Sequence, residues 1–492
     1  MKSVNLGSEK TWPVILRLAL PAMAAQIVNV LYSIVDKIYV GQLGNGPLAG
    51  IGVCAPVTTA LSAFAFWVSL GGGPLFSMSL GEKREDNAKK ILANSFLMLI
   101  VFALALDVLA YSFMKPMLYA FGASSHSYIY AKQYLQIYLI GLVFAILSLG
   151  LNEFLTAQGM SLEAMLSTLA ACLLNIGLDP LFMFVAKMGI EGAALATILC
   201  QFVSFLVSLF LLLRKKTPIR LSFGSYDIKL MGKILKLGFS PFIILATDSF
   251  LLIAYNEAFQ HFGSSVPSSS LAPIFGENAS ENSYGDFLIE VNTIVSSFES
   301  LVTGPLLGIS SGTQPILAYN YGAKREDLIK KSEKQIFAFA IVFTAACFAL
   351  SYLLERPFAE LFIRFQSSAD AVASYKEAII EKSVRYIQVY MYVIVPLSLQ
   401  YVTVDGLTGM GQANTSIWLS INRKFFVMLP AIFLFPLLFQ AMGKNAIEVA
   451  ESSFYAEFVA DLASAIVSTS VYFLVLPKIL KKRMTSQKKA VV

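Results

Sequence analysis

Two aspartates interrupt long apolar stretches of this sequence, and their side chains could together bind a cation. Asp36 lies near the end of the apolar segment 13–40, and Asp179 lies near the end of the segment 161–184. An ionised carboxylate in hydrocarbon costs at least about 3 kcal/mol, so each carboxyl needs a partner, a cavity or a bound ion. At a helical rise of about 1.5 Å per residue, both carboxyls are expected roughly 6 to 8 Å from the ends of their helices. We therefore expect one shared site that takes up a proton or a sodium ion.

Three uncharged polar residues are expected near this pair. Asn175 precedes Asp179 by one helical turn and so lies on the same helix face. Thr197 lies roughly 12 Å from the near end of its helix, and Tyr138 enters a further helix at a comparable depth. The alternative for Asp36 is a pair with Lys37 or a local backbone cap, although adjacent residues of a helix do not face each other.

Helices that cross a membrane must position these side chains. The chain has 492 residues, of which 57% are hydrophobic and only 14% are charged, which is more apolar than an ordinary soluble domain. About 20 apolar residues are needed to cross a bilayer. The sequence therefore predicts an all-α integral membrane protein with twelve spans, at residues 13–40, 47–76, 91–113, 128–157, 161–184, 189–213, 234–260, 285–317, 333–354, 380–408, 413–440 and 446–476.

Basic residues predict the orientation of these spans. Segments on the side of the N-terminus hold 27 of the 37 Lys and Arg residues, two of them after the tenth span, and the other side holds 9. By the positive-inside rule both termini are cytoplasmic, and the stretch 261–286 is an outer loop. We expect a multi-pass protein of the cell membrane, plasma or inner, with the lipid bilayer as its surroundings. Because the basic residues gather at helix ends rather than in one groove, no nucleic acid is expected as a partner.

The sequence also contains an internal duplication. The segment Gly81-Glu82-Lys83-Arg84-Glu85-Asp86 recurs as Gly322-Ala323-Lys324-Arg325-Glu326-Asp327, an offset of 241 residues. Further matches at this offset are Gly71 with Gly312 and Pro74 with Pro315, and Leu155-Thr156 match Leu407-Thr408 at an offset of 252. We expect two six-helix lobes, made by residues 1–220 and 221–492.

Because each half has an even number of spans, both halves begin on the same side and are parallel repeats, related by an axis along the membrane normal. A cleft between the lobes would open alternately to each side as one lobe rocks against the other. The acidic pair has no counterpart in the second half, since Asp36 matches Tyr255 and Asp179 matches Phe435. Coupling to a cation is therefore expected in the first half, and Asp36→Asn or Asp179→Asn is expected to abolish gradient-driven transport.

Several other classes of protein lack support in the sequence. The two histidines, His126 and His261, lie outside the spans or at their ends, and no metal, nucleophile-elbow or nucleotide-loop motif occurs. The four cysteines are scattered through apolar runs, which indicates neither a disulfide framework nor a metal site. No catalytic residue and no cofactor is expected beyond the coupling proton or sodium ion, so the chain is not expected to be an enzyme. Two parallel halves with a buried acidic pair fit an alternating-access transporter better than a passive channel.

Longer motifs resemble those of the multidrug and toxic compound extrusion (MATE) transporters over nearly the whole chain. They are Val35-Asp36-Lys37-Ile38-Tyr39-Val40-Gly41 with Gly44, Ala157-Gln158-Gly159, Leu174-Asn175-Ile176-Gly177-Leu178-Asp179-Pro180, Gly189-Ile190-Glu191-Gly192-Ala193-Ala194-Leu195-Ala196-Thr197 and Gly312-Thr313-Gln314-Pro315-Ile316-Leu317-Ala318-Tyr319-Asn320-Tyr321-Gly322-Ala323. The last segment looks most like the prokaryotic branch that contains the DinF and MepA exporters.

The resemblance implies a V-shaped pair of lobes with a central cleft, working as a monomer. It implies export of small lipophilic, often cationic compounds by antiport with a proton or sodium ion. It also implies that Asp36, Asn175, Asp179 and Thr197 form the ion-responsive or proton-responsive cluster, with Na⁺ at Asp36 and Asp179 if sodium is the coupling ion. Thr156 stands where the family often has a basic residue, and the loop 261–286 is longer than usual, which leaves the substrate preference open.

Two further acids could attract a cationic substrate. Glu153 and Asp405 correspond at the offset of 252 and could flank the cleft symmetrically, although capping of the cytoplasmic helix ends explains them equally well. The alternative function is a flippase for lipid-linked saccharides, which must hold an anionic pyrophosphate with Arg or Lys. Only Lys37 and Arg423 are expected to approach the membrane interior, whereas many acids do, which favours a cationic or neutral substrate.

Overall fold

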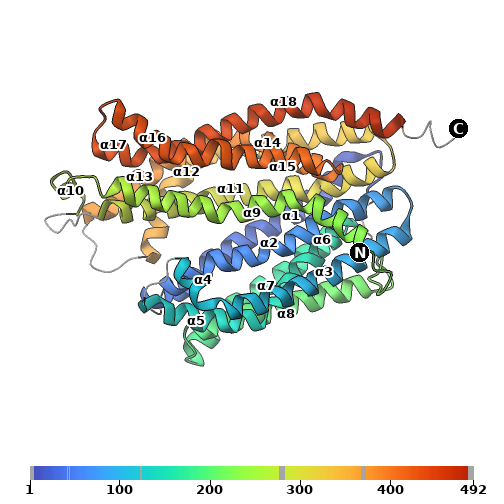
Figure 1. The fold of residues 1–492 in the computed structure, drawn as a ribbon, viewed down its shortest axis with the longest axis horizontal. Coiled ribbons are helices and arrows are strands. Elements are labelled where there is room, and N and C mark those ends of the chain that lie inside the picture. The colour runs from blue at the N-terminus through green and yellow to red at the C-terminus, as the bar shows by residue number, and fades with distance from the viewer. Residues whose placement is uncertain are drawn as a thin grey trace.

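The computed structural model describes residues 5–41, 43, 45–121, 125–275, 283–366 and 373–485, and every regular element within these ranges is a helix. Gly44 and residues 276–282 of the predicted outer loop lie outside the described residues. Figure 1 shows the long helices running side by side along the longest axis, with those of the first half (blue to green) below those of the second half (green to red).

The N-terminal lobe contains α1 (Thr11–Gly41), α2 (Asn45–Gly81), α3 (Glu85–Ser112), α4 (Met114–Ala120), α5 (Ser125–Ile140), α6 (Leu142–Ala157), α7 (Ser161–Pro180), the π-helix η1 (Leu181–Val185) and α8 (Ile190–Leu213). The C-terminal lobe contains α9 (Ile228–Gly263), α10 (Ser268–Phe275), α11 (Ser283–Gly322), α12 (Glu326–Gln366), α13 (Ala373–Met391), α14 (Ile394–Gly409), α15 (Ala413–Ile421), the π-helix η3 (Asn422–Met428), α16 (Leu429–Ala441), α17 (Ala446–Glu451), η4 (Ser452–Phe454) and α18 (Tyr455–Thr485). The predicted lobe boundary at 220/221 falls between α8 and α9.

Helices occur at all twelve predicted spans. Among the described residues, eight helical segments are long and apolar enough to cross a membrane, and two bent pairs would raise that number to ten. The long helices α9 and α11 lie at the remaining two predicted positions. Part of the stretch 261–286 is helical rather than loop, because α9 continues to Gly263 and α10 follows it. The fold is thus an all-α membrane architecture of two six-helix lobes.

The fourth and tenth spans are bent, and the bends belong to the repeat. The helices before and after Gly141 make an angle of 59°, and those before and after residues 392–393 make an angle of 52°. Gly141 and Val393 correspond at the offset of 252. A Cβ on Gly141 would lie 2.3 Å from Ile198 Cγ2 of α8, so the bend brings α5 and α6 close against α8. Apolar composition predicted the spans but carries no signal for these bends.

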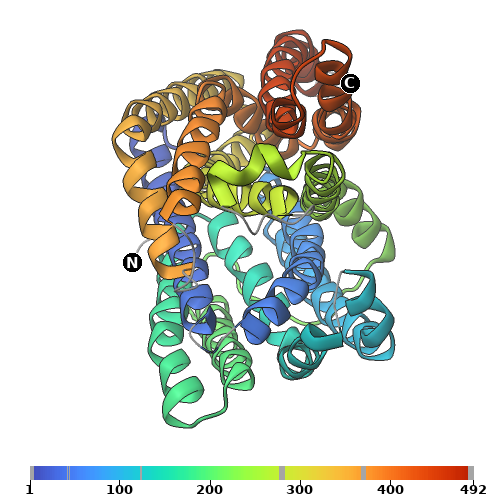
Figure 2. The same ribbon diagram turned by 90° about the vertical axis from the view of Figure 1, so that its left-hand side faces the viewer.

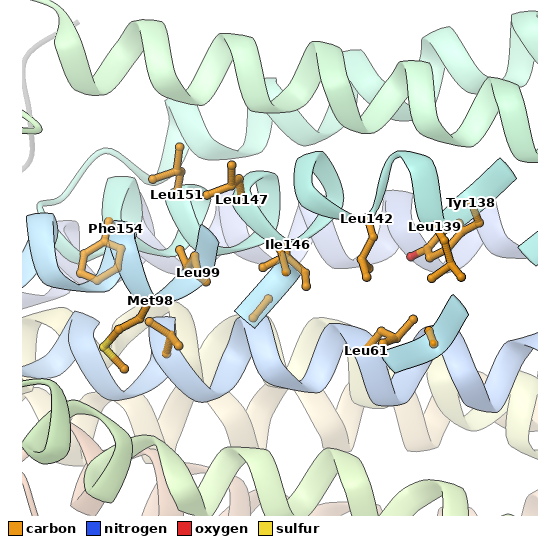
Figure 3. Packing of buried hydrophobic residues seen from close by; sticks show 14 of the residues in the cluster. Leu61, Met98, Leu99, Tyr138, Leu139, Leu142, Ile146, Leu147, Leu151 and Phe154 are labelled. Atoms are coloured by element: carbon orange, nitrogen blue, oxygen red, sulfur yellow. The ribbon is translucent and has the colours of Figure 1, made fainter. Parts of the chain in front are cut away.

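Close packing holds each lobe together. Lipid tails are as apolar as Leu, so the association of helices within a membrane depends on van der Waals contact rather than on exclusion of water. Figure 3 shows Leu61 of α2 and Met98 and Leu99 of α3 facing side chains of α6 from Leu142 to Phe154. A Cβ on Gly150 would lie 2.4 Å from Leu99 Cδ1, so a small residue brings α6 and α3 together.

The two lobes meet along α1, α2, α9 and α11. α1 packs on α11 and α2 packs on α9 (Figures 1 and 2). A Cβ on Gly238 of α9 would lie 1.8 Å from the carbonyl oxygen of Trp67 of α2, so these backbones touch. The first part of α1, including Leu18 and Met23, shares a buried cluster with helices of the C-terminal lobe. α1 therefore packs against helices of both lobes.

Candidate cation and substrate sites

Asp36 of α1 and Asp179 of α7 lie together in the N-terminal lobe. The two helices pack against each other, and the carboxyl of Asp36 lies within hydrogen-bonding reach of the carboxyl of Asp179, which is fully buried. Two carboxyl groups share a hydrogen bond only when one of them carries a proton. When both are ionised they repel each other unless a cation lies between them. The arrangement of this pair therefore depends on whether it holds a proton or another cation.

Neighbouring side chains orient the pair. Asn175 Nδ2 donates a hydrogen bond of 3.2 Å to Asp179 Oδ1, one helical turn away, as the spacing predicted. Tyr32 of α1, one turn before Asp36, lies near Thr197 of α8, whose buried hydroxyl has no hydrogen-bond partner among the described residues. Tyr32 was not among the predicted site residues, although its spacing of four residues from Asp36 places both on one helix face.

Tyr138 was predicted at the depth of the acidic pair and as a member of the coupling cluster. Its hydroxyl forms a hydrogen bond with Ser62 of α2. The phenol of Tyr134, one turn earlier on α5, interacts electrostatically with Asp36 and with Tyr32. The two tyrosine rings stack with their centroids 6.1 Å apart. Tyr134 is thus near enough to Asp36 for an electrostatic interaction with it. A depth estimate from the sequence could not distinguish Tyr134 from Tyr138, because the two residues are only one helical turn apart.

The backbone of α7 changes immediately after Asp179. Pro180 lacks a backbone N–H and so removes one helical hydrogen bond. Residues Leu181–Val185 continue as a π-helix, a form that occurs frequently at functional sites. The pair thus lies beside a point at which α7 departs from regular helical geometry.

A cavity of about 150 Å³ lies next to Tyr32, Asn175 and Thr197, the neighbours of the acidic pair, and reaches the lobe interface. Asn175 and Thr197 line one part of it, Glu153 of α6 lines another, and Gly308 and Gly312 of α11 enter from the C-terminal lobe. Cavities that hold drug-sized ligands measure roughly 300 to 1,000 Å³. In this arrangement the cavity has room for a small ion and water but not for a bulky compound.

Glu153 and Asp405 approach each other across the lobe interface, where their charges interact. Asp405 also forms a hydrogen bond with Ser310 of α11, and its backbone carbonyl accepts one of 3.1 Å from Gln314 Nε2. Next to Glu153, between α2, α6 and α11, the free space shrinks to about 10 Å³. Glu153 therefore lies beside a tightly packed part of the interface.

Two basic residues that the orientation count assigned to the segment after the tenth span are buried within a helix. Arg423 and Lys424 are 8% and 6% exposed, in the π-helix η3 and roughly 15 Å from the start of α15. The Nη2 and Nε atoms of Arg423 both lie 2.7 Å from Asp461 Oδ1 of α18, which is fully buried. The expectation that Lys37 and Arg423 alone approach the membrane interior therefore omitted Lys424.

This charged cluster borders a second cavity, of about 320 Å³, in the C-terminal lobe. Its lining includes Arg423, Lys424, Glu299, Glu457 and Asp405. Intramembrane charges are costly and commonly mark substrate or ion sites, so this cavity is a second candidate site. A partial signal of this site is present in the sequence, since Asn422-Arg423-Lys424 interrupts an otherwise apolar stretch.

The donor set at Asp36 and Asp179 suits a proton or a hard cation such as Na⁺, because the oxygen ligands are carboxylates with an amide and hydroxyls nearby. Among the described residues, no group of three or more His, Cys, Asp and Glu side chains could hold a metal ion. The site thus offers two carboxylates rather than a transition-metal cage.

Comparisons with known proteins agree with this architecture. The MatE family model matches residues 21–181 and 282–434, one stretch in each half of the chain. A MepA multidrug export protein of Staphylococcus haemolyticus is 25% identical over 349 residues, covering 70% of this chain and 72% of that protein. An FAD transporter of Shewanella oneidensis is 24% identical over 422 residues, covering 85% of this chain and 86% of that protein.

Solved structures show the same fold. A structure described as the outward-facing conformation of a multidrug resistance MATE family transporter of the MOP superfamily superposes with a TM-score of 0.83 at 20% identity, covering 98% of this chain and 99% of that chain. The family model, which covers more than half of the chain, together with the two-lobe fold shows that this protein belongs to the MATE family of transporters and is MepA-like within it.

Proposed function

We propose that this transporter exports small lipophilic, often cationic compounds by antiport with a proton or a sodium ion. The observation that carries the proposal is the contact of Asp36 with buried Asp179 on two different helices. Such a pair binds a cation or proton in one state and releases it in another, and transport requires this kind of exchange. The donor set suits either coupling ion.

α1 is the element that links cation binding to lobe movement. Its second half carries Asp36, and its first half packs into the C-terminal lobe, where a Cβ on Gly308 of α11 would lie 2.7 Å from Met23 Cα. A change in the contact between α1 and α7 thus changes the fit of α1 against α11. The π-helix after Asp179 gives α7 a place to adjust.

The sizes of the cavities support alternating access rather than an open pore. The space beside Asn175 and Thr197 measures about 150 Å³, and the interface next to Glu153 is nearly closed. A bulky substrate therefore needs the lobes to separate before it reaches this region. The carboxylates of Glu153 and Asp405 at the interface favour a cationic substrate.

We further propose that the protein works as a monomer in the cell membrane with both termini in the cytoplasm. The lobe interface is complete within one chain, and most Lys and Arg residues lie on the side of the termini.

The test follows ethidium in proteoliposomes under separate proton and sodium gradients. Wild-type protein is expected to move dye with one of the two gradients, and Asp36→Asn is expected to abolish that movement at matched expression. The control is Asp107→Asn, which changes an aspartate of α3, a helix that packs mainly on α2 and α6. Dye that follows neither gradient, or normal export by Asp36→Asn, would refute the proposal.

The second candidate is transport of a compound that carries an anionic group, such as a dinucleotide or a lipid-linked pyrophosphate. The buried Arg423 and Lys424 beside the 320 Å³ cavity favour it, and one relative is named as an FAD transporter. Competition between dye export and uptake of FAD, or flipping of a lipid-linked pyrophosphate, separates the candidates. Lys424→Met is expected to reduce transport of the anionic compound and to spare dye export if this second function holds.

A further inference from the structure

A third cavity, open to solvent and about 780 Å³ in volume, lies where the lobes meet at the terminal face. We define the terminal face as the end of the molecule at which α1 begins and α18 ends (right in Figure 1), with the loops at 82–84 and 323–325. The cavity is lined by Asn5, Gly7, Gly81, Glu82, Lys83, Arg84, Tyr319, Gly322, Ala323, Lys324 and Arg325. Both lobes thus supply its walls.

The basic side chains of this cavity are related by the internal repeat. Lys83 and Arg84 correspond to Lys324 and Arg325 at the offset of 241. The backbone agrees, because Lys83 and Lys324 have left-handed φ angles of 59° and 58°, which L-residues rarely adopt. The two halves therefore present the same basic turn to one cavity from opposite sides.

The symmetry is broken at one position, with a consequence for charge. Glu82 of the first turn corresponds to Ala323 of the second. The lining therefore holds four basic side chains and one carboxylate, a net charge of +3.

Arg84 lies 3.3 Å from Glu82, and Arg325 lies 3.4 Å from Glu9 while it donates to the carbonyl of Gly7 at 2.8 Å. Within the described ranges no carboxylate pairs with Lys83 or Lys324. Two lysines are thus left to attract an anion.

We propose that this cavity binds an anion bearing a phosphate group. Arg guanidinium groups suit phosphate oxygens, and Lys ammonium groups add charge without a fixed direction. The group could belong to the headgroup of an anionic lipid or to a soluble phosphate compound, since both present the same chemistry. The positive-inside rule alone explains basic residues in ordinary cytoplasmic loops. It does not explain why two equivalent basic turns line one cavity.

The proposed ligand would act on the lobes as well as on the loops. The cavity exists only while Gly81 lies against Tyr319 and Gly322 lies against Met78, contacts that close the terminal face. Separation of the lobes at this face would divide the basic residues between them. An anion that binds the closed arrangement more tightly shifts the population toward it, and this effect does not depend on the identity of the exported compound.

The experiment uses the full-length protein and the double variant Lys83→Gln/Lys324→Gln. The matched control is Lys215→Gln/Lys216→Gln, which removes the same charge from exposed residues in the connection between α8 and α9. In one arm, protein in uncharged detergent is titrated with inorganic pyrophosphate and binding is measured by calorimetry. In the other, vesicles of phosphatidylcholine with or without phosphatidylglycerol are compared, with a spin-label distance across the terminal face as the readout.

If the ligand is a soluble phosphate compound, pyrophosphate should bind the wild-type protein and the control with equal affinity. Its affinity for the cavity variant should be lower by about tenfold or more. For a lipid headgroup, phosphatidylglycerol should shorten the spin-label distance in the wild type and control but not in the cavity variant. The proposal is overturned if neither ligand has an effect, or if the control loses the effect as fully as the cavity variant, because the response would then reflect net charge alone. Salt should weaken a genuine effect, since exposed charges are screened within about 10 Å at 0.1 M.

Discussion

Gly81 and Gly322 occupy equivalent positions in the two halves, and each lies against the backbone of the other half. A Cβ on Gly81 would lie 1.9 Å from the carbonyl oxygen of Tyr319, and one on Gly322 would lie 2.1 Å from the carbonyl oxygen of Met78. Met78 and Tyr319 are themselves equivalent at the offset of 241. The crossing of α2 and α11 is therefore a reciprocal contact of the kind found at two-fold interfaces.

Replacement of either glycine should open the terminal face. A methyl group at Gly81 or Gly322 meets backbone atoms that cannot move aside alone, and such overpacking costs about 1 to 3 kcal/mol. Because the cost applies only while α2 and α11 touch, Gly81→Ala should shift the lobes toward separation at this face. Spin labels on Lys83 and Lys324 would report a longer distance.

The control for this prediction is Gly232→Ala on α9, whose added Cβ would meet no atom within 4 Å. It should leave the distance unchanged and should tend to stabilise α9, since Ala exceeds Gly in helix propensity by about 1 kcal/mol. Unaltered distances in both Gly81→Ala and Gly322→Ala would show that the contact does not hold the lobes closed.

Tyr134 should matter more to coupling than Tyr138. The phenol of Tyr134 interacts with Asp36, whereas the hydroxyl of Tyr138 is bonded to Ser62. Tyr134→Phe removes a polar group beside the acidic pair and should reduce gradient-driven export severalfold, while Tyr138→Phe should keep it near the wild-type rate. Initial rates of dye efflux, with both variants at equal protein density, provide the measurement. Equal rates for the two variants would contradict the placement.

The sequence was sufficient to predict features that depend on the cost of burying charge. Asp36 and Asp179 were predicted to meet because hydrocarbon does not tolerate isolated carboxylates, and the twelve helical positions followed from apolar length. The spacing of one helical turn predicted that Asn175 would lie on the face of Asp179, and its 3.2 Å hydrogen bond to Asp179 confirms this.

Other features depend on how helices pack, which residue type alone does not reveal. Arg423 and Lys424 were counted with the segment after the tenth span, although they fall within the predicted span 413–440. Asp461 on α18 lets Arg423 stay inside that span. That ion pair joins residues 38 positions apart, and no local pattern indicates it. The bends at Gly141 and Val393 likewise arise from contacts between helices, such as the approach of Gly141 to Ile198.

Asn175→Ala should weaken coupling without unfolding the lobe. Asn175 donates to Asp179, and a hydrogen bond to a charged group contributes about 1.5 to 3 kcal/mol. Its loss should lower gradient-driven dye export about tenfold or more. Thr168→Ala is the control, because Thr168 lines the same cavity but, among the described residues, its hydroxyl donates only to the carbonyl of Ala164 in its own helix. If both variants export dye equally well, Asn175 has no special role at the pair.

Replacement of either Arg423 or Asp461 alone should destabilise the protein, whereas replacement of both by apolar residues should not. Removal of one partner leaves the other as a buried, uncompensated charge, which costs about 3 to 5 kcal/mol. Asp461→Asn and Arg423→Met alone should therefore each lower the unfolding temperature of the detergent-solubilised protein markedly. The double variant Arg423→Met/Asp461→Leu buries no charge at these positions, and well-packed apolar replacements of a buried pair are often neutral.

The double variant should consequently be more stable than either single variant, a non-additivity that a double-mutant cycle measures. Transport by this double variant then separates structure from function in the C-terminal lobe. If the 320 Å³ cavity serves only packing, the double variant should export dye at the wild-type rate. If Arg423 binds an anionic group of the substrate, the stable double variant should lose transport of that compound while it keeps its fold. Equal instability of all three variants would refute the ion-pair argument itself.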